Sequence, residues 1–375
     1  MISYVNNRIM KISCLLVVLF ILMVVQPARS FEFYGFGDVT YTKADEDNND
    51  KDSSKNGQFA LGQLDLYTTL EIDDRIDILV EIVLESPGGE WGIDGERIEV
   101  GYLFSDALQV RVGRFHNLIG YWNTSYHHGA HLQTTIGRPD FLEFEDEAGI
   151  LPAHIVGLWA RGRKKLEPIV LNYGLMLGNG SQLKGKIGEA ALDPNNTTDN
   201  NTNKSFSFNL TIEPAAYSGA GIGLFGNLSR VARLAVKDDP KETKTEGTIA
   251  TEVDQTILGA DIFYKRNGAE FIAEYYNIKD KDKLGSDDFT NNAYYIQGGY
   301  RLIEKFTPYL RYENFSDKDN DPYMIALGRK DSIRWIGGIK YDIMYRSAIK
   351  AEYRSIDDED KKKVNEYAVQ WTFAF

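Results

Sequence analysis

The feature that most constrains the fold is an alternation of apolar and polar residues that recurs along most of the chain. Between residues 75 and 85, for example, every second position is aliphatic, and most of the intervening positions are acidic or basic. Successive side chains of a β-strand point to opposite faces, so this period of two predicts strands with one apolar and one polar face. A soluble β-sandwich would show the same alternation, so the connections between strands must decide between the two folds.

The predicted connections alternate strictly between short and long. The short ones cover residues 73–75, 105–106, 163–167, 214–218, 266–268, 303–305 and 342–345, and the long ones cover residues 43–57, 86–94, 117–152, 179–204, 230–253, 279–291, 316–331 and 355–363. Tight turns at one end and long loops at the other are typical of transmembrane β-barrels. We therefore predict an all-β, antiparallel transmembrane barrel of sixteen strands, with fourteen or eighteen within the error of the boundaries.

The N-terminal segment predicts export from the cytoplasm. Basic residues precede an apolar run over residues 12–25, and small residues stand three and one positions before Phe31. This arrangement is typical of a cleaved signal peptide. We therefore expect residues 1–30 to be removed and residues 31–375 to form the mature barrel. An uncleaved membrane anchor is the alternative, although the run is short for a membrane span.

Composition restricts the class of function. The expected signal peptide contains the only cysteine, Cys14, and three basic residues, so its removal takes the formal net charge from −13 to −16. A chain without cysteine forms no disulfide and no thiolate metal site. A strongly anionic chain is also a poor partner for nucleic acid, and we expect none to bind.

The last predicted strand, residues 364–375, carries the most specific motif. Its apolar and aromatic residues occupy every second position up to the C-terminus: Tyr367, Val369, Trp371, Phe373 and Phe375. This pattern resembles the C-terminal signal of outer-membrane β-barrels, which implies a location in the bacterial outer membrane and the barrel-assembly machinery as a partner. Because backbone amides in hydrocarbon need partners, we expect this strand to pair with the first, residues 31–42.

The third long loop, residues 117–152, is the longest connection and combines aromatic residues with an acidic cluster. A loop this apolar is expected to fold into the barrel and pack against the inner wall. In strand count and loop rhythm the chain resembles the general porins, whose third loop narrows the pore. The preceding segment, residues 111–115 with the sequence RVGRF, is also similar to strands before this loop in porins, including the phosphate-selective group.

Two sets of charged residues are candidates for the pore constriction. The acidic set lies in the third loop and comprises Asp140, Glu143, Glu145, Asp146 and Glu147. The basic set lies at inward positions of predicted strands and comprises Arg97, Arg111, Arg301, Arg311, Arg334, Lys340, Lys350 and Arg354. Opposite charges across a constriction would create a transverse field that orients polar solutes. The alternative is ordinary salt bridges with wall carboxylates such as Glu270, Glu274, Glu313 and Glu352, and the sequence does not choose.

The five histidines all lie between residues 116 and 154. His127 and His131 are four positions apart, which suits one face of a helical turn, and imidazole binds Zn²⁺ or Cu²⁺. No adjacent carboxylate or cysteine completes a ligand set. We therefore expect no metal and no other cofactor, with the histidines serving as polar pore lining.

These features favour an outer-membrane porin, a water-filled channel for passive diffusion of ions and small polar solutes that the third loop constricts. We expect contacts with membrane lipid and lipopolysaccharide, and a homotrimer by analogy with sixteen-stranded porins. A substrate-specific transporter and an adhesin-type barrel without an open pore use similar walls and stay as alternatives. An outer-membrane enzyme is a further alternative, but no histidine stands near a nucleophile in a catalytic pattern, so we expect no enzyme.

Overall fold

The computed structural model describes residues 30–45, 56–85, 91–126, 129–145, 149–185, 188–195, 197–198, 202–233, 252–283, 287–317 and 321–375. Within these residues, sixteen long strands form the barrel. They are β1 (Ser30–Ala44), β2 (Gln58–Glu71), β3 (Ile76–Glu85), β4 (Gly92–Ser105), β5 (Leu108–His116), β6 (His154–Leu166), β7 (Ile169–Asn179), β10 (Lys204–Pro214), β11 (Ala220–Arg233), β12 (Glu252–Arg266), β13 (Ala269–Asp282), β14 (Asp288–Tyr300), β15 (Phe306–Asp317), β16 (Ser332–Met344), β17 (Ser347–Asp358) and β18 (Val364–Ala374). The predicted signal peptide, except for Ser30, lies outside the described residues.

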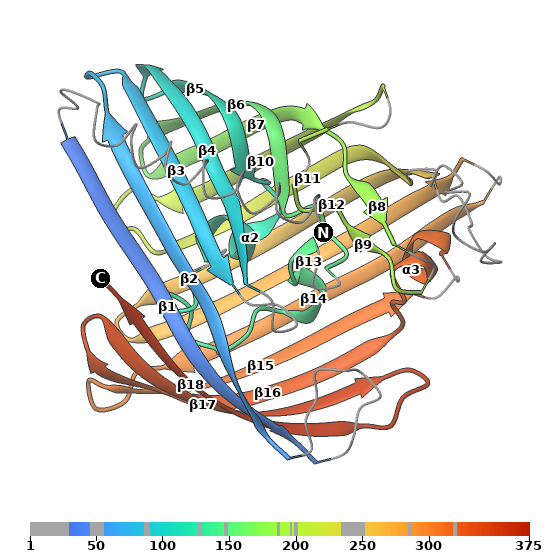
Figure 1. Ribbon diagram of the computed structural model, residues 1–375. Coiled ribbons are helices and arrows are strands. Elements are labelled where there is room, and N and C mark those ends of the chain that lie inside the picture. Colours follow the sequence, from blue (N-terminus) through green and yellow to red (C-terminus); the bar gives the residue numbers. More distant parts are fainter. Residues whose placement is uncertain are drawn as a thin grey trace, which may run out of the picture.

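Neighbouring barrel strands pair antiparallel, and β1 pairs with both β2 and β18, so the sheet closes on itself (Figure 1). At the closure, Gly37 lies opposite Phe373 and Thr42 lies opposite Ala368. Closure gives the backbone groups of the first and last strands the partners that they need in hydrocarbon. The predictions of an all-β antiparallel barrel and of sixteen strands are confirmed.

Short turns join the strands at one end of the barrel, which we call the turn end, and long loops join them at the other, the loop end. In the turn between β2 and β3, the Asp73 carboxylate accepts the backbone N–H groups of Arg75 and Ile76 at 2.7 and 2.9 Å, a hydrogen-bond pattern that favours aspartate in turns. Some strands run further than predicted. The pairing of Val253 with Asp282 carries β13 into the predicted loop 279–291.

The outer face of the barrel is apolar. Large aliphatic side chains that are about half exposed recur from strand to strand, among them Leu158, Leu175, Leu224, Leu258, Ile296 and Leu310. A belt of this kind is typical of a lipid-facing surface. Together with closure of the sheet it agrees with the predicted location in the bacterial outer membrane. None of the described helices is long and apolar enough to cross a membrane.

The seam between β1 and β18 depends on aromatic rings that lie over glycine. A Cβ atom added to Gly35 would overlap the ring of Phe375, and one added to Gly37 would overlap the ring of Phe373. Because Gly35 and Gly37 have no side chains, the first strand leaves room for the rings of Phe375 and Phe373. The other members of the C-terminal motif, Tyr367, Val369 and Trp371, are also exposed, and the reading of this motif as an assembly signal stays a prediction.

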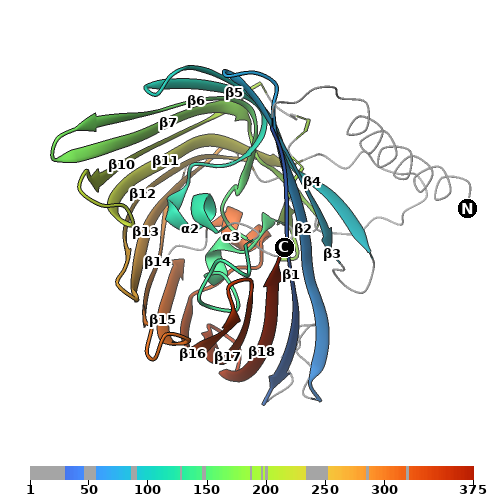
Figure 2. The same ribbon diagram turned by 90° about the vertical axis from the view of Figure 1, so that its left-hand side faces the viewer.

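Loop segments lie within the ring of strands, and Figure 2 shows α2 (Gly120–Ser125) and α3 (Pro322–Ala326) there. The third loop also holds the short helix η2 (Asp140–Leu142), and the fourth holds the short strands β8 (Gln182–Lys184) and β9 (Ala191–Leu192). Their apolar side chains pack on one another and on inward residues of β11–β15, forming a core that includes Ile119, Trp122, Phe141, Leu183, Leu192, Phe225, Ile257, Tyr276, Tyr295, Phe315 and Tyr323.

Candidate functional site

The third loop is fastened to the inner wall through its backbone. Three wall carboxylates on alternate strands accept loop N–H groups: Glu274 of β13 from Trp122 at 2.7 Å, Glu313 of β15 from Asp140 at 2.8 Å and Glu352 of β17 from Ile136 at 2.6 Å. All three carboxylates are buried. Three such hydrogen bonds on alternate strands fix the height of the loop in the barrel.

Two buried basic residues of the same wall complete this attachment. Arg311 of β15 donates to the Gly137 and Arg138 carbonyls at 2.9 and 3.0 Å, and Lys350 of β17 donates to the Ala130 and Thr135 carbonyls at 2.6 and 2.7 Å. The Arg311 guanidinium also forms an ion pair with Glu313 at 2.6 Å. Arg311 and Lys350 therefore bind the backbone carbonyls of the loop.

Asp140 of the third loop also meets two basic residues, Arg334 of β16 and Arg329 of the loop that precedes this strand. Its side chain lies 2.7 Å from the Arg329 guanidinium and 2.8 Å from that of Arg334. Burial by itself would raise the pKa of Asp140, but Arg329 and Arg334 together hold it below its usual value. The carboxylate is therefore charged at neutral pH, and its ion pairs with Arg329 and Arg334 hold this part of the loop in place.

Apolar contacts anchor the start of the loop. The Trp122 side chain is fully buried, and its ring meets that of Tyr295 edge-on at 5.8 Å. Tyr121 stacks on Phe263 at 4.3 Å. Aromatic pairs of this geometry add about 0.5–1.5 kcal/mol to the burial of their surface. The loop is thus held by a core as well as by charges.

The strands from β2 to β6, which we call the early wall, are lined differently. Arg111 forms ion pairs with Glu99 and Asp77, both at 2.6 Å, and Arg97 pairs with Glu81. These partners belong to the neighbouring strands β3 and β4. Arg97 and Arg111 of the early wall therefore pair with carboxylates of the same wall. On the strands from β12 to β17, which we call the late wall, the buried charges described above bond to the loop instead.

Several solved structures of outer-membrane proteins have a similar architecture. OmpT, an outer membrane protein of Vibrio cholerae, matches in a form lacking loop L8 with a TM-score of 0.62 and 12% identity over 93% of this chain and 100% of that one. An anion-selective porin from Comamonas acidovorans matches with a TM-score of 0.60 and 15% identity, over 92% of this chain and 99% of that one. The outer membrane channel DcaP of Acinetobacter baumannii matches with a TM-score of 0.56 and 11% identity, over 92% of this chain and 97% of that one.

The fold is that of the outer-membrane porins. No protein-family model matches the sequence, and neither does any curated protein, so the likeness is one of architecture. Identity this low, over nearly the whole length of both chains, means that the fold is shared while most residues differ.

The remaining predicted constriction residues lie at several levels of this porin fold. Arg301 is exposed at the turn end, where it lines a cavity with Lys340 and with Thr134 of the third loop. Arg354 pairs with Glu352 and Glu366 at 2.8 and 2.6 Å. Glu143 is half-buried within the loop, and Asp146 and Glu147 lie outside the described residues. A constriction role for the whole set stays a prediction.

The histidines are arranged differently from the pattern considered in the sequence. His127 lies outside the described residues, and the ring of His131 hydrogen-bonds the Thr372 hydroxyl of β18 at 3.1 Å. Burial and the cations Lys340 and Lys350 lower the pKa of His131, so it is neutral at physiological pH. The histidines that come together are His116 and His154, which the sequence did not pair because the strand register brings them opposite each other.

Glu145 points away from the basic set. Its carboxylate accepts the backbone N–H of His154 at 2.8 Å and lies 3.0 Å from Nδ1 of the same histidine. On its other side the His154 ring contacts Glu96 of β4. Glu96, His116 and His154 form the group in the described part of the chain that is suited to hold a metal ion.

Proposed function

We propose that this chain is an outer-membrane porin that forms a water-filled channel for ions and small polar solutes, with the third loop as its constriction. The observation that carries the proposal is the docking of the middle of this loop, from Trp122 to Asp140, on the late wall. Its backbone bonds to buried charges there, while Arg97 and Arg111 of the early wall pair with carboxylates of that wall. A path between the loop and the early wall would be polar along its length.

The pairing of charges on the early wall supports weak ion selectivity. Arg111 faces two carboxylates and Arg97 faces one, so a passing ion meets closely spaced charges of both signs. Such a lining favours polar solutes over apolar ones and admits ions of either sign. Two proteins of the same fold are described as a porin and as an outer membrane channel, which supports a channel over an enzyme.

Reconstitution of the purified barrel into planar lipid bilayers tests this proposal. We expect discrete conductance steps, with a reversal potential close to zero in a salt gradient because both ion signs pass. A barrel that inserts, as shown by protection of its strands from protease, but gives no conductance steps would overturn the open-channel proposal.

A substrate-specific channel is the second candidate, and the apolar core inside the barrel favours it. The third loop, the fourth loop and α3 all contribute to this core against β11–β15, so they take up lumen space that a wide general pore would leave to water. Liposome-swelling assays with sugars, amino acids and carboxylates of graded size separate the candidates. A general porin sorts them by size, whereas a specific channel admits one chemical class out of size order.

We also propose a homotrimer embedded in lipid and lipopolysaccharide, which receives its fold from the barrel-assembly machinery. Support comes from OmpT, whose trimer form has a TM-score of 0.58 with this chain at 12% identity. The glycines on the outside of β1 do not add to this support, because aromatic rings of the same chain lie over Gly35 and Gly37. Native mass spectrometry of the detergent-extracted protein tests the stoichiometry.

A further inference from the structure

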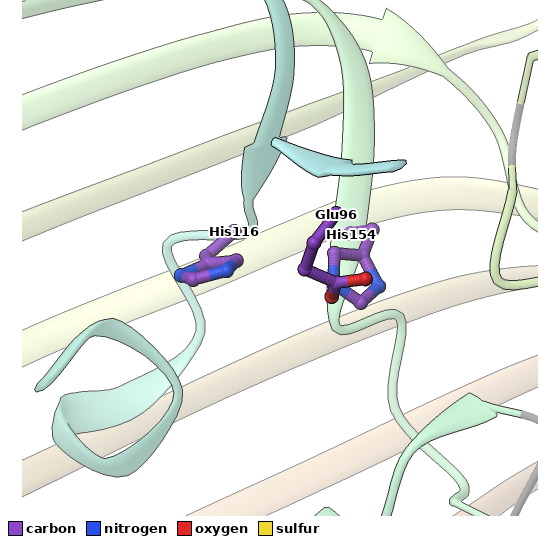
Figure 3. Close-up of side chains that lie close together, drawn as sticks. All are labelled: Glu96, His116 and His154. Carbon is purple, nitrogen blue, oxygen red and sulfur yellow. The ribbon is translucent and has the colours of Figure 1, made fainter. Parts of the chain in front are cut away.

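Three ionisable side chains gather on the inner face where the third loop leaves and rejoins the wall. Glu96 lies on β4, His116 is the last residue of β5 and His154 is the first residue of β6 (Figure 3). His116 and His154 are opposite each other in the register, and their rings are 5.7 Å apart. Since successive strands supply them, the barrel wall itself sets their spacing.

We propose that Glu96, His116 and His154 bind one divalent transition-metal ion, with Zn²⁺ as the first choice. One ligand atom from each residue lies within 4.8 Å of the other two. Glu96 and His154 are buried, and His116 is nearly so. Two imidazole nitrogens and one carboxylate oxygen are a ligand set that Zn²⁺ accepts, with a fourth position left for water.

The geometry needs only small adjustments. Ligand atoms bound to one Zn²⁺ at about 2.0–2.2 Å lie roughly 3.3 Å apart in a tetrahedron. The ligand atoms that are farthest apart must approach by up to about 1.5 Å, and the Glu96 carboxylate must move away from the His154 ring that it now contacts. Glu81, whose carboxylate is 3.7 Å from the His116 Nε2, is within reach as a further oxygen donor.

Glu145 supplies the outer support that such a site requires. It accepts the His154 backbone N–H at 2.8 Å, and its second oxygen lies 3.0 Å from the His154 Nδ1. A hydrogen bond from Nδ1 to a carboxylate fixes the ring and leaves Nε2 facing Glu96, as in most histidine ligands of metals. Glu145 belongs to the third loop, so an ion at this site would connect the loop to three wall strands.

A small cavity beside two of the ligands is rich in carboxylates. It reaches both Glu96 and His154, and its lining includes the carboxylates of Glu85 and Asp94 as well as Glu145. Arg114, whose guanidinium is 3.7 Å from Glu96, is the opposing charge. Carboxylates outnumber this single arginine around the cavity, which favours the approach of a divalent cation.

The experiment uses the full-length barrel, purified without a histidine tag, stripped with chelator and titrated with Zn²⁺ against a chromophoric competitor. We expect one ion per chain. Binding should be lost in Glu96→Gln and in His116→Asn, and Glu145→Gln should weaken it about 10–100-fold. Titration with Co²⁺ should give visible absorption bands that change in Glu145→Gln, which marks a positioning role for Glu145.

The matched control is His131→Asn, which removes a histidine of the same loop that bonds to Thr372 and should leave Zn²⁺ binding unchanged. Circular dichroism verifies that each variant is folded. His116→Asn is the mildest of the ligand variants, because it leaves the ion pairs of His154 with Glu96 and Glu145 in place. Absence of Zn²⁺ binding by the unaltered barrel would mean that the cluster is a purely ionic contact. That result, unchanged binding in the two ligand variants, or loss of binding in the control, overturns the proposal. The site does not depend on whether the barrel conducts.

Discussion

The early and late walls of the barrel have the same strand pattern but opposite relations to the third loop. On the early wall, Arg111 is buried between the carboxylates of Glu99 and Asp77 on adjacent strands. On the late wall, Arg311 is equally buried, but it spends two of its hydrogen bonds on carbonyls of the loop. Both arginines thus have carboxylate partners on the wall, but only Arg311 also bonds to the backbone of the third loop.

This difference shows that the alternation of a strand sets which side chains face inward but not what they do there. Some inward charges, such as Arg111, pair with carboxylates of the wall, and others, such as Arg311, bond to the backbone of the loop as well. The loop needs such bonds because its own N–H and C=O groups, once inside the barrel, lose water. Variants that remove one kind of contact at a time can break or sharpen the comparison.

The largest effect is expected from Trp122→Ala. Truncation of a fully buried tryptophan costs roughly 3–5 kcal/mol, and Trp122 sits in the core that the loop forms with inward residues of β11–β15. We expect faster cleavage within the third loop by added protease and noisier conductance. Trp335→Ala, at a half-exposed site on β16, is the control and should change neither. Equal protease resistance in both variants would contradict the anchoring role of Trp122.

Arg311→Gln and Arg111→Gln test the two walls directly. Removing one partner of a buried ion pair costs about 3–5 kcal/mol, and a glutamine that keeps some hydrogen bonds should fall near the lower limit. Both variants should unfold at lower denaturant concentration. Only Arg311→Gln should also expose the third loop to protease. If Arg111→Gln released the loop as readily, the distinction between the walls would be wrong.

The pH dependence of loop docking gives a smaller effect. Because the pKa of Asp140 lies below its usual value in the folded protein, its contribution to docking is complete above about pH 4, the unfolded-state value, and is lost as the pH falls toward the folded value. Protease resistance of the loop should therefore hold at neutral pH and decline below about pH 4, measured with an acid-active protease. Asp140→Asn should dock less firmly at neutral pH and should lack this dependence. A decline that persists in Asp140→Asn would have to arise elsewhere.

The smallest effect is expected at the edge of the loop. His131→Ala removes one hydrogen bond to Thr372, worth about 0.5–1.5 kcal/mol. We expect a slight fall in the unfolding midpoint and no change in conductance. A large change in conductance would show that the position of the loop also depends on β18, so that this strand would have to be counted among those that hold the loop.

Much of the fold could be predicted from the sequence, because turn and loop lengths record on which side of the membrane each connection lies. The docking of the third loop could not be read in the same way. Its acidic residues were the conspicuous candidates, yet the main acceptors of its backbone are the wall carboxylates Glu274, Glu313 and Glu352. Their partners are backbone groups, which leave no trace in composition or spacing.

The histidine cluster shows a second limit. Spacing along the chain drew attention to His127 and His131, whereas the group suited to a metal joins His116 and His154 across a strand pair and adds Glu96 from the next strand. Strand register creates this proximity, and register depends on where the long loop returns to the wall. The residues at both ends of the loop were visible in the sequence, but their meeting point was not.

The seam described above has a consequence for biogenesis. The rings of Phe373 and Phe375 lie over Gly37 and Gly35 once the barrel is closed. If these aromatic residues form the recognition signal, closure covers part of the surface by which an assembly factor holds the chain. The first strand would then compete with the factor for the same rings. Closure of the barrel would thereby also release the chain from the assembly factor, and a bulkier residue at Gly37 would slow both closure and release.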